Sequence, residues 1–193
     1  MLNLKFIRNC LLAAALLLGT AASAAEPANP LRDPYLINPG DVLRISVWRE
    51  EALSRELPVS PDGHIGFPLA GDIVAAGKTI EQLRLELTEK LSRLIPDASV
   101  TVSALQLQGN SIYVVGAVNR PGPYQMNRPT DAMQAIALAG GPTPFADLND
   151  IKILRRSDNG RQIAIPFKFS AVQDGDNLEQ NILLRAGDTV VIP

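Results

Sequence analysis

Few residues in this chain have the side chains that catalysis needs. His64 is the only histidine, and it stands in the segment Pro61-Asp62-Gly63-His64. A histidine that acts as a general base needs a nucleophile and an orienting group beside it, and the sequence marks neither. A solvated turn residue is therefore the better interpretation of His64, and no catalytic residue is predicted.

The sequence also contains few residues that could bind a metal ion or a nucleotide. Only one histidine is present, and the only cysteine, Cys10, lies in the N-terminal segment interpreted below as a removable signal, so the exported chain has mainly carboxylates as candidate zinc ligands. The segment 174–177 has the composition of a calcium loop, but the residue eleven positions after Asp174 is Arg185 and not the glutamate of an EF-hand. Gly140 and Gly141 follow a predicted helix, whereas a phosphate-binding loop precedes one. No metal ion and no cofactor are expected.

Trp48 is the side chain best suited to binding. It ends a predicted strand over 42–48, on the polar face that also carries Arg44 and Ser46. An aromatic ring on a polar face can stack on a sugar ring or anchor a protein interface. Tyr113 and Tyr124 are weaker candidates of the same kind. Packing between lobes or between subunits stays open as the alternative role of these rings.

The first residues have the pattern of a secretory signal peptide. A basic start and an apolar run over 10–18 precede Ala22-Ser23-Ala24, which is an A-x-A cleavage site. We expect cleavage after Ala24, or after Ala25 as the second choice. An extended leader rich in proline then covers 25–34.

Removal of the signal narrows the possible partners. It takes away two of the 18 basic residues and none of the 20 acidic ones, so the exported chain has 16 against 20 and a net charge of −4. Nucleic acid is not expected as a partner, because phosphate binding needs clustered Lys and Arg. The only cysteine, Cys10, leaves with the signal, and the residues before it do not fit a lipidation site, so neither a disulfide nor a lipoprotein is predicted. No exported segment has the roughly 20 apolar residues of a membrane-spanning helix.

An amphipathic helix is the clearest element of the first half. Thr79 and Gln82 have the spacing of a capping box, apolar residues recur every three or four positions from Ile80 to Leu94, and Pro96 ends the pattern. Around this helix we predict strands over 42–48, 57–60, 65–69, 73–75 and 100–107, with a hairpin turn at 61–64.

A second unit follows Gln108-Gly109-Asn110. It is predicted to contain a short helix over 131–139 with Thr130 as its N-cap, and strands over 112–118, 151–155, 161–165 and 187–192. Three Gly-Asp steps, at 40–41, 71–72 and 187–188, each stand at the entrance to a strand, where glycine supplies unusual backbone angles and aspartate bonds nearby backbone. The predicted fold class is α+β, with two small β-rich lobes that each have one main helix.

Several motifs occur in a fixed order along the exported chain. In the first unit they run from Tyr35 to Trp48, from Val59 to Gly71, and through the helix that Thr79 begins; in the second they run over 115–124, 139–141 and 184–193. This ordered set resembles the polysaccharide export domain of bacterial outer-membrane polysaccharide export proteins, followed by one SLBB (soluble-ligand-binding β-grasp) domain. The turn residues of the motifs, for which a structural role is expected, are Pro39, Gly40, Asp41, Asp62, Gly63, Gly116, Pro121, Gly122, Gly140, Gly141, Gly187 and Asp188.

The resemblance implies how the chain is divided and what it does. The signal would cover 1–24, the leader 25–34, the polysaccharide export domain 35–108 and the β-grasp-like SLBB domain 111–193. Such a protein would form an oligomeric ring in the periplasm, peripheral to the outer membrane, and would act with an inner-membrane co-polymerase to export a capsular or extracellular polysaccharide. Larger relatives carry a C-terminal amphipathic helix and an N-terminal lipid, which this sequence lacks, so a separate outer-membrane component is a further expected partner.

Two other classes of function stay open. The first is a periplasmic module that binds a glycan without transporting it. The second is a polysaccharide-modifying enzyme, which would need paired carboxylates that converge in a cleft, and the sequence singles out no such pair. A conduit needs no catalyst, so the preferred interpretation is an export protein that is not an enzyme.

Overall fold

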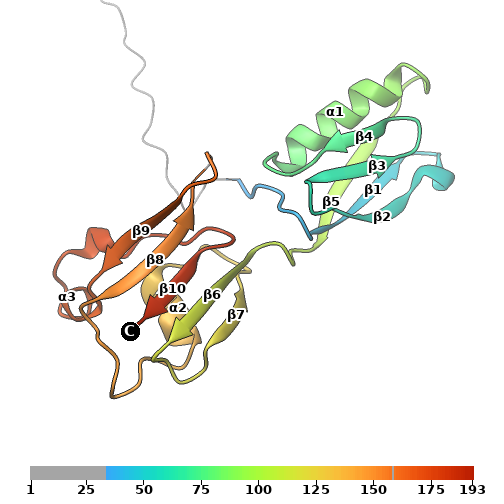
Figure 1. Ribbon diagram of the computed structural model, residues 1–193. Coiled ribbons are helices and arrows are strands. Elements are labelled where there is room, and N and C mark those ends of the chain that lie inside the picture. Colours follow the sequence, from blue (N-terminus) through green and yellow to red (C-terminus); the bar gives the residue numbers. More distant parts are fainter. Residues whose placement is uncertain (1–33, 158) are drawn as a thin grey trace, which may run out of the picture.

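The computed structural model describes residues 34–157 and 159–193. The predicted signal peptide, its cleavage at Ala24 or Ala25 and nearly all of the leader lie outside these residues. The described chain forms two β-rich lobes joined by the segment between β5 (Val100–Gln106) and β6 (Ser111–Gly116) (Figure 1). Each lobe has its own cluster of buried apolar side chains. The predicted α+β class with two small lobes is confirmed.

A three-stranded antiparallel sheet and one helix build the first lobe. The strand order is β2-β1-β5, and a separate two-stranded sheet, β3-β4, lies beside it. Alternate residues of the central strand, Leu43, Ile45 and Val47, are buried in one core with residues of the helix, because successive side chains of a strand point to opposite faces. The elements are β1 (Val42–Val47), a 3-10 turn (Glu51–Leu53), β2 (Arg55–Pro58), β3 (His64–Phe67), β4 (Gly71–Val74) and α1 (Ile80–Ser92).

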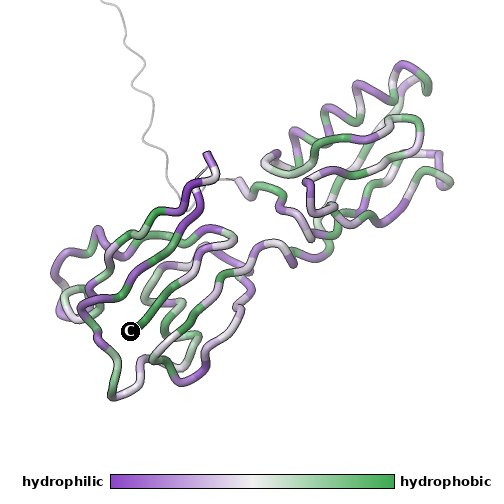
Figure 2. Tube along the Cα trace, viewed as in Figure 1, coloured by the Kyte–Doolittle hydropathy of each residue, from purple (hydrophilic) through white to green (hydrophobic). Residues whose placement is uncertain are grey.

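Helix α1 begins as the sequence predicts. The Gln82 amide donates to Thr79 Oγ1 at 3.1 Å and the Thr79 amide donates to Gln82 Oε1 at 2.8 Å, which completes the capping box. Leu83, Leu87 and Leu91 are fully buried, and along α1 hydrophobic and hydrophilic residues alternate (Figure 2). The helix ends before Leu94, which is 60% exposed, so the apolar stripe is one turn shorter than predicted.

The predicted hairpin about 61–64 is wrong in its pairing. Strand β2 pairs with β1, with Leu57 opposite Leu43, whereas β3 pairs with β4, with Ile65 opposite Ile73. The turn itself is present, because the Gly63 amide donates to the Ser60 carbonyl at 2.8 Å. Val59 carries the chain from one sheet to the other: its side chain enters the core while its amide is held by the Asp41 carbonyl.

The second lobe is a five-stranded mixed sheet covered by helices. Its strand order is β7-β6-β10-β8-β9, in which β10 lies between two antiparallel hairpins, β6-β7 and β8-β9, and runs parallel to β6. Helix α2 packs Ala132, Ala135 and Ile136 into the core, since small side chains let a helix approach a sheet closely. The elements are β6, β7 (Gly122–Gln125), α2 (Ala132–Leu138), β8 (Ile151–Arg156), β9 (Gln162–Phe167), α3 (Phe169–Gln173), a 3-10 turn (Leu178–Gln180) and β10 (Thr189–Ile192).

The start of α2 corrects one prediction. Its N-cap is Asp131 and not Thr130: the Gln134 amide donates to Asp131 Oδ1 at 2.8 Å, and the Asp131 amide returns a bond to Gln134. Thr130 is buried, and its hydroxyl donates to the Arg128 carbonyl. Threonine and aspartate are both good N-caps, so the sequence pattern does not distinguish adjacent candidates. Strand β7, in the segment interpreted as a turn, is an addition to the predicted elements.

Candidate functional site

Two of the three Gly-Asp steps at strand entrances hold a buried carboxylate. Asp41 and Asp188 are 0% and 1% exposed, whereas Asp72 is exposed. Both buried residues make the same local bond, in which the amide three residues earlier donates to Oδ2 at 2.8 Å: from Asn38 to Asp41, and from Arg185 to Asp188. This geometry closes the turn that leads into β1 and β10.

Distant groups complete the environment of each buried carboxylate. The Tyr35 hydroxyl donates to Asp41 Oδ2 at 2.6 Å, and burial, with this bond, raises the pKa of Tyr35. Arg155 donates to both oxygens of Asp188, with Nη2 2.6 Å from Oδ2. In the described part of the chain, every buried side-chain nitrogen and oxygen has a hydrogen-bond partner. These two sites are therefore structural anchors, with no polar atom left over for a ligand.

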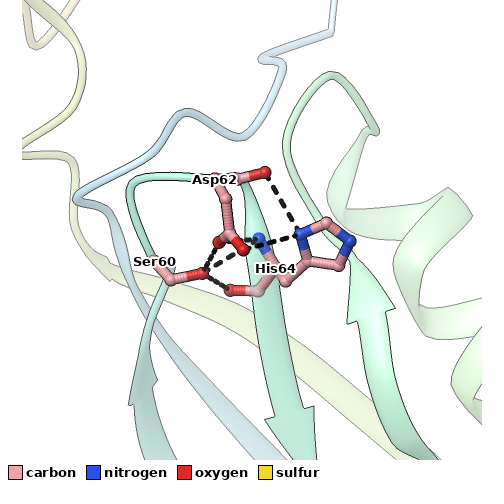
Figure 3. Close-up of polar contacts among 3 residues, drawn as sticks. All are labelled: Ser60, Asp62 and His64. Atoms are coloured by element: carbon pink, nitrogen blue, oxygen red, sulfur yellow. Dashed lines mark hydrogen bonds and ion pairs between the residues drawn. The ribbon is translucent and has the colours of Figure 1, made fainter.

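Ser60, Asp62 and His64 lie together but not in the order of a catalytic triad (Figure 3). The Ser60 hydroxyl contacts the Asp62 carboxylate and lies 2.7 Å from the His64 carbonyl oxygen. The imidazole Nδ1 lies 3.1 Å from the Asp62 carbonyl oxygen and 3.4 Å from its carboxylate. A triad needs the serine hydroxyl on an imidazole nitrogen, so this arrangement cannot activate Ser60. The bond from Ser60 also lowers the pKa of Asp62 and keeps it ionised.

The same turn borders a shallow hollow of about 470 Å³. Asp62, His64 and Asp72 lie at its wall, but within residues 34–157 and 159–193 no three His, Cys, Asp or Glu side chains are grouped so that they could hold a metal ion. The calcium-like segment 174–177 follows α3 and caps its C-terminus, where the Asp176 amide donates to the Ala171 carbonyl at 2.8 Å.

Trp48 lies in the turn that directly follows β1, since the strand ends at Val47, one residue before the end predicted from the sequence. Its side chain is 71% exposed, and its amide donates to the Ser99 carbonyl at 2.9 Å. Beside it is a groove of about 420 Å³ whose floor includes Val47. The other residues that line the groove, which we call the Trp48 groove, are Ser46, Trp48, Arg49, Glu51, Ser99 and Thr101.

The structure does not bring the three candidate aromatic residues together. Tyr113 lies on the second lobe and is 46% exposed, on the sheet face opposite α2. Tyr124 is half-buried against the second core, and its hydroxyl donates to the Arg120 carbonyl at 2.5 Å. The Trp48 groove is therefore the candidate binding site. Sequence reasoning missed Arg49 and Glu51, although both adjoin Trp48, and it missed Ser99 and Thr101, which only the pairing of β1 with β5 places there.

Comparisons with known proteins divide the chain in the same order. Residues 29–105 match the family described as polysaccharide biosynthesis/export protein, and residues 111–166 match the SLBB domain. Both halves of the resemblance predicted from the sequence are thereby confirmed. In addition, no helix among the described residues is long and apolar enough to cross a membrane.

Among curated proteins, the chain is similar to three export-related proteins of longer length. It is 32% identical to the EPS I polysaccharide export outer membrane protein EpsA of Ralstonia nicotianae, over 81% of this chain and 46% of that protein. It is 31% identical to the exopolysaccharide production protein ExoF of Rhizobium meliloti, over 81% and 36%, and 30% identical to the polysialic acid transport protein KpsD of Escherichia coli, over 65% and 23%. The chain spans less than half the length of these relatives.

Proposed function

Because the chain carries a polysaccharide biosynthesis/export domain followed by an SLBB domain, we propose that it is a component of a system that exports a capsular or extracellular polysaccharide. The order of the two domains is the observation that carries this proposal. The names of the similar proteins support it, since EpsA, ExoF and KpsD are a polysaccharide export protein, an exopolysaccharide production protein and a polysialic acid transport protein.

The protein acts after secretion, in the periplasm and at the periphery of the outer membrane. The signal-peptide pattern with cleavage at Ala24 or Ala25 supports secretion. The name of the similar protein EpsA describes an outer membrane protein, which supports this location. An inner-membrane co-polymerase is the partner that would supply the polymer.

A closed homo-oligomeric ring is the assembly proposed for the conduit. A closed ring forms when one head-to-tail contact is repeated between identical subunits and its rotation closes, and it encloses a lumen without any added subunit type. The sheet face of the second lobe opposite α2 supports such contacts, because Tyr113 and Val115 are exposed on it. The strand order β7-β6-β10-β8-β9 with two hairpins and a central parallel pair supports the β-grasp assignment of this lobe.

The proposed role is non-enzymatic. A conduit must let its cargo pass, so it needs weak contacts and no bond-breaking groups. The geometry of Ser60 and His64 agrees with this, since the hydroxyl faces a carboxylate instead of an imidazole nitrogen.

A glycan-binding module without transport activity is the second candidate function. The exposed Trp48 in a groove with hydroxyl-bearing residues favours it. It differs from the export proposal in one respect: a pure binding module can be deleted without retaining polymer inside the cell envelope.

Deletion of the gene tests the export proposal. We expect the deletion strain to lose surface polysaccharide and to accumulate polymer in the periplasm, and the wild-type gene to restore export. A gene that lacks residues 2–24 is the matched control, since its product would stay in the cytoplasm and would not restore export. Unchanged surface polymer in the deletion strain would contradict the proposal. Native mass measurement of the secreted protein tests the ring, and a strict monomer counts against it.

A further inference from the structure

The sheet face of the first lobe that is turned away from α1 is polar. The pairing of β1 with β5 places Ser46 opposite Thr101 and Arg44 opposite Ser103, while Glu56 lies on the other side of Arg44. Trp48 stands at the end of this row. The Trp48 groove beside it, at about 420 Å³, falls within the size of small-ligand sites, which is roughly 300–1,000 Å³.

The polar groups of the Trp48 groove have no partners within the described chain. The hydroxyls of Ser46, Ser99 and Thr101 take part in no hydrogen bond there, and neither Arg49 nor Glu51 forms an ion pair with any described residue. On the same sheet face but outside the groove, Arg44 and Glu56 do have partners, because Arg44 donates to Glu56 at 2.5 Å. The groove therefore presents hydroxyl, carboxylate and guanidinium groups that a ligand can bond without first breaking an internal contact.

The backbone under Trp48 is held at both ends of a tight turn. The Trp48 amide donates to the Ser99 carbonyl at 2.9 Å, and the Glu50 amide donates to the Val47 carbonyl at 3.1 Å. Arg49 between them has φ of +63°, a left-handed conformation that is uncommon for a residue with a side chain. A turn fixed in this way presents the indole ring on a firm base, so little backbone freedom is lost when a ligand stacks on it.

We propose that the Trp48 groove binds one pyranose unit of a polysaccharide. The apolar C–H face of the sugar stacks on the indole ring of Trp48. The Glu51 carboxylate accepts hydrogen bonds from sugar hydroxyls, and Arg49 donates to sugar oxygens. Ser46, Ser99 and Thr101 complete the polar contacts. This inference rests on the proposed export function, because that function makes a polysaccharide the available ligand.

The composition of the groove favours a sugar over a protein partner. The centres of protein interfaces are depleted in charge and enriched in apolar side chains. Here the only apolar lining residue besides Trp48 is Val47, which is buried. Arg49 and Glu51 carry opposite charges, so the groove has no net charge of its own. Binding should therefore depend on stacking and hydrogen bonds, and it should change little with ionic strength.

The chain contains a single tryptophan, so its fluorescence reports on this groove alone. The probe is the polysaccharide purified from the culture medium of the strain that carries the gene, together with oligosaccharides made from it by partial acid hydrolysis. We expect a saturable change in the emission of the secreted protein when either probe is added. The matched control is Phe145→Ala, which removes an exposed ring from the other lobe and should leave the titration unchanged.

Calorimetric titration with the same oligosaccharides measures the affinity of each variant, including those in which the tryptophan is replaced. Trp48→Ala should weaken binding by about tenfold, as expected when one aromatic contact is lost, and Trp48→Phe should retain part of the affinity. Glu51→Gln should also weaken binding, whereas Asp72→Asn, an exposed change outside the groove, should not. Circular dichroism of each variant checks that the fold is kept.

Three results would overturn the inference. The first is tryptophan emission that does not change when the probes are added. The second is a Trp48→Ala variant that binds the oligosaccharides as tightly as the wild type. The third is a Trp48→Ala variant whose oligomer mass changes while its affinity for the oligosaccharides does not. These results are independent of the deletion test. If deletion of the gene abolishes surface polymer but the Trp48→Ala variant exports normally, the export function stands and only the proposed sugar site is contradicted.

Discussion

Asp41 and Gly109 are joined by a hydrogen bond that fixes the chain between the two lobes. The Gly109 amide donates to Asp41 Oδ1 at 3.0 Å, across 68 positions of sequence. The next residue is held by the second lobe, since the Met126 amide donates to the Asn110 carbonyl at 2.8 Å. Neighbouring residues are thus bonded to different lobes, which leaves almost no free chain between them.

Asp41→Ala tests the anchor in the first lobe. The change removes the acceptor for the Tyr35 hydroxyl and for the amides of Asn38 and Gly109. The three donors are partly buried, and a buried donor without an acceptor costs about 1–3 kcal/mol, so the free energy of unfolding should fall by about 3 kcal/mol. Urea denaturation measures it. Asp72→Ala is the control in the exposed Gly-Asp step and should change stability by less than about 0.5 kcal/mol. Equal effects of the two changes would contradict the anchor.

Gly109→Ala tests the close packing of the connector. An added Cβ would lie 2.3 Å from the Pro39 carbonyl oxygen, so the connector would have to move. We expect a loss of about 1–3 kcal/mol in stability and faster proteolysis between the lobes, measured by urea denaturation and by limited digestion with proteinase K, a protease of low specificity that does not need a basic residue in the connector. Gly66→Ala is the matched control, because its Cβ would meet only the flexible Asp72 side chain, at 3.3 Å. Unchanged digestion of Gly109→Ala would show that the connector is looser than its contacts indicate.

Arg155→Met tests the ion pair of the second lobe. Asp188 is buried, and Arg155 is the cation that contacts it, so the change leaves an uncompensated charge inside the lobe. The expected loss of stability is about 3–5 kcal/mol. Arg84→Met breaks the solvent-exposed pair with Glu81 and should lower stability far less, because water screens such a pair. Thermal and urea unfolding of both variants and the wild type measure the two losses of stability. Equal losses would contradict the expectation that burial makes the Arg155–Asp188 pair more important.

Because the pKa of Tyr35 is raised in the folded protein, we expect the wild-type protein to lose stability at high pH. Burial raises its pKa in the folded protein above the ordinary value of about 10, and the bond to Asp41 acts in the same direction. Below pH 10 the phenol is protonated in both states and no penalty arises. Above that pH the unfolded chain loses the proton more readily, so stability falls as the pH rises. The urea midpoint of the wild type should fall more between pH 9 and 11 than that of Tyr35→Phe; parallel curves would contradict this. Tyr113→Phe, at an exposed ring, should behave as the wild type.

Ser60→Ala and His64→Ala test whether this pair has a catalytic role. The Ser60 hydroxyl faces Asp62 and not the imidazole, so neither side chain is placed to activate the other. Strains with either variant should carry the same surface polysaccharide as the wild type. Loss of surface polymer with a folded His64→Ala protein, together with depolymerisation of the cognate polymer by the purified wild type, would restore the enzyme hypothesis.

Elements that depend on neighbouring residues could be predicted from the sequence. The capping box of α1 and the alternating faces of β1 need only the spacing of side chains within one segment, and both are present. The exposed position of Trp48 follows from the same alternation. Recognition of the two domains also succeeded, because ordered turn motifs survive where pairwise identity is low.

Contacts between distant segments could not be predicted in this way. The hairpin assigned about 61–64 was wrong, since β2 has a partner in β1 and β3 has one in β4. The lining of the Trp48 groove by Ser99 and Thr101 depends on the register of β5 against β1, and a shift of one residue would turn other side chains to that face.

The three Gly-Asp steps at strand entrances show what the local sequence determines and what depends on tertiary structure. From the sequence alone all three are strand entrances with equivalent local turns, because glycine and aspartate impose their preferences on the residues beside them. Tertiary structure makes them different. Asp41 and Asp188 are buried because Tyr35, Gly109 and Arg155 come from elsewhere in the chain to bond them, while Asp72 has no such partner among the described residues and stays in water. A buried charge needs partners, and only the folded chain brings those partners within reach.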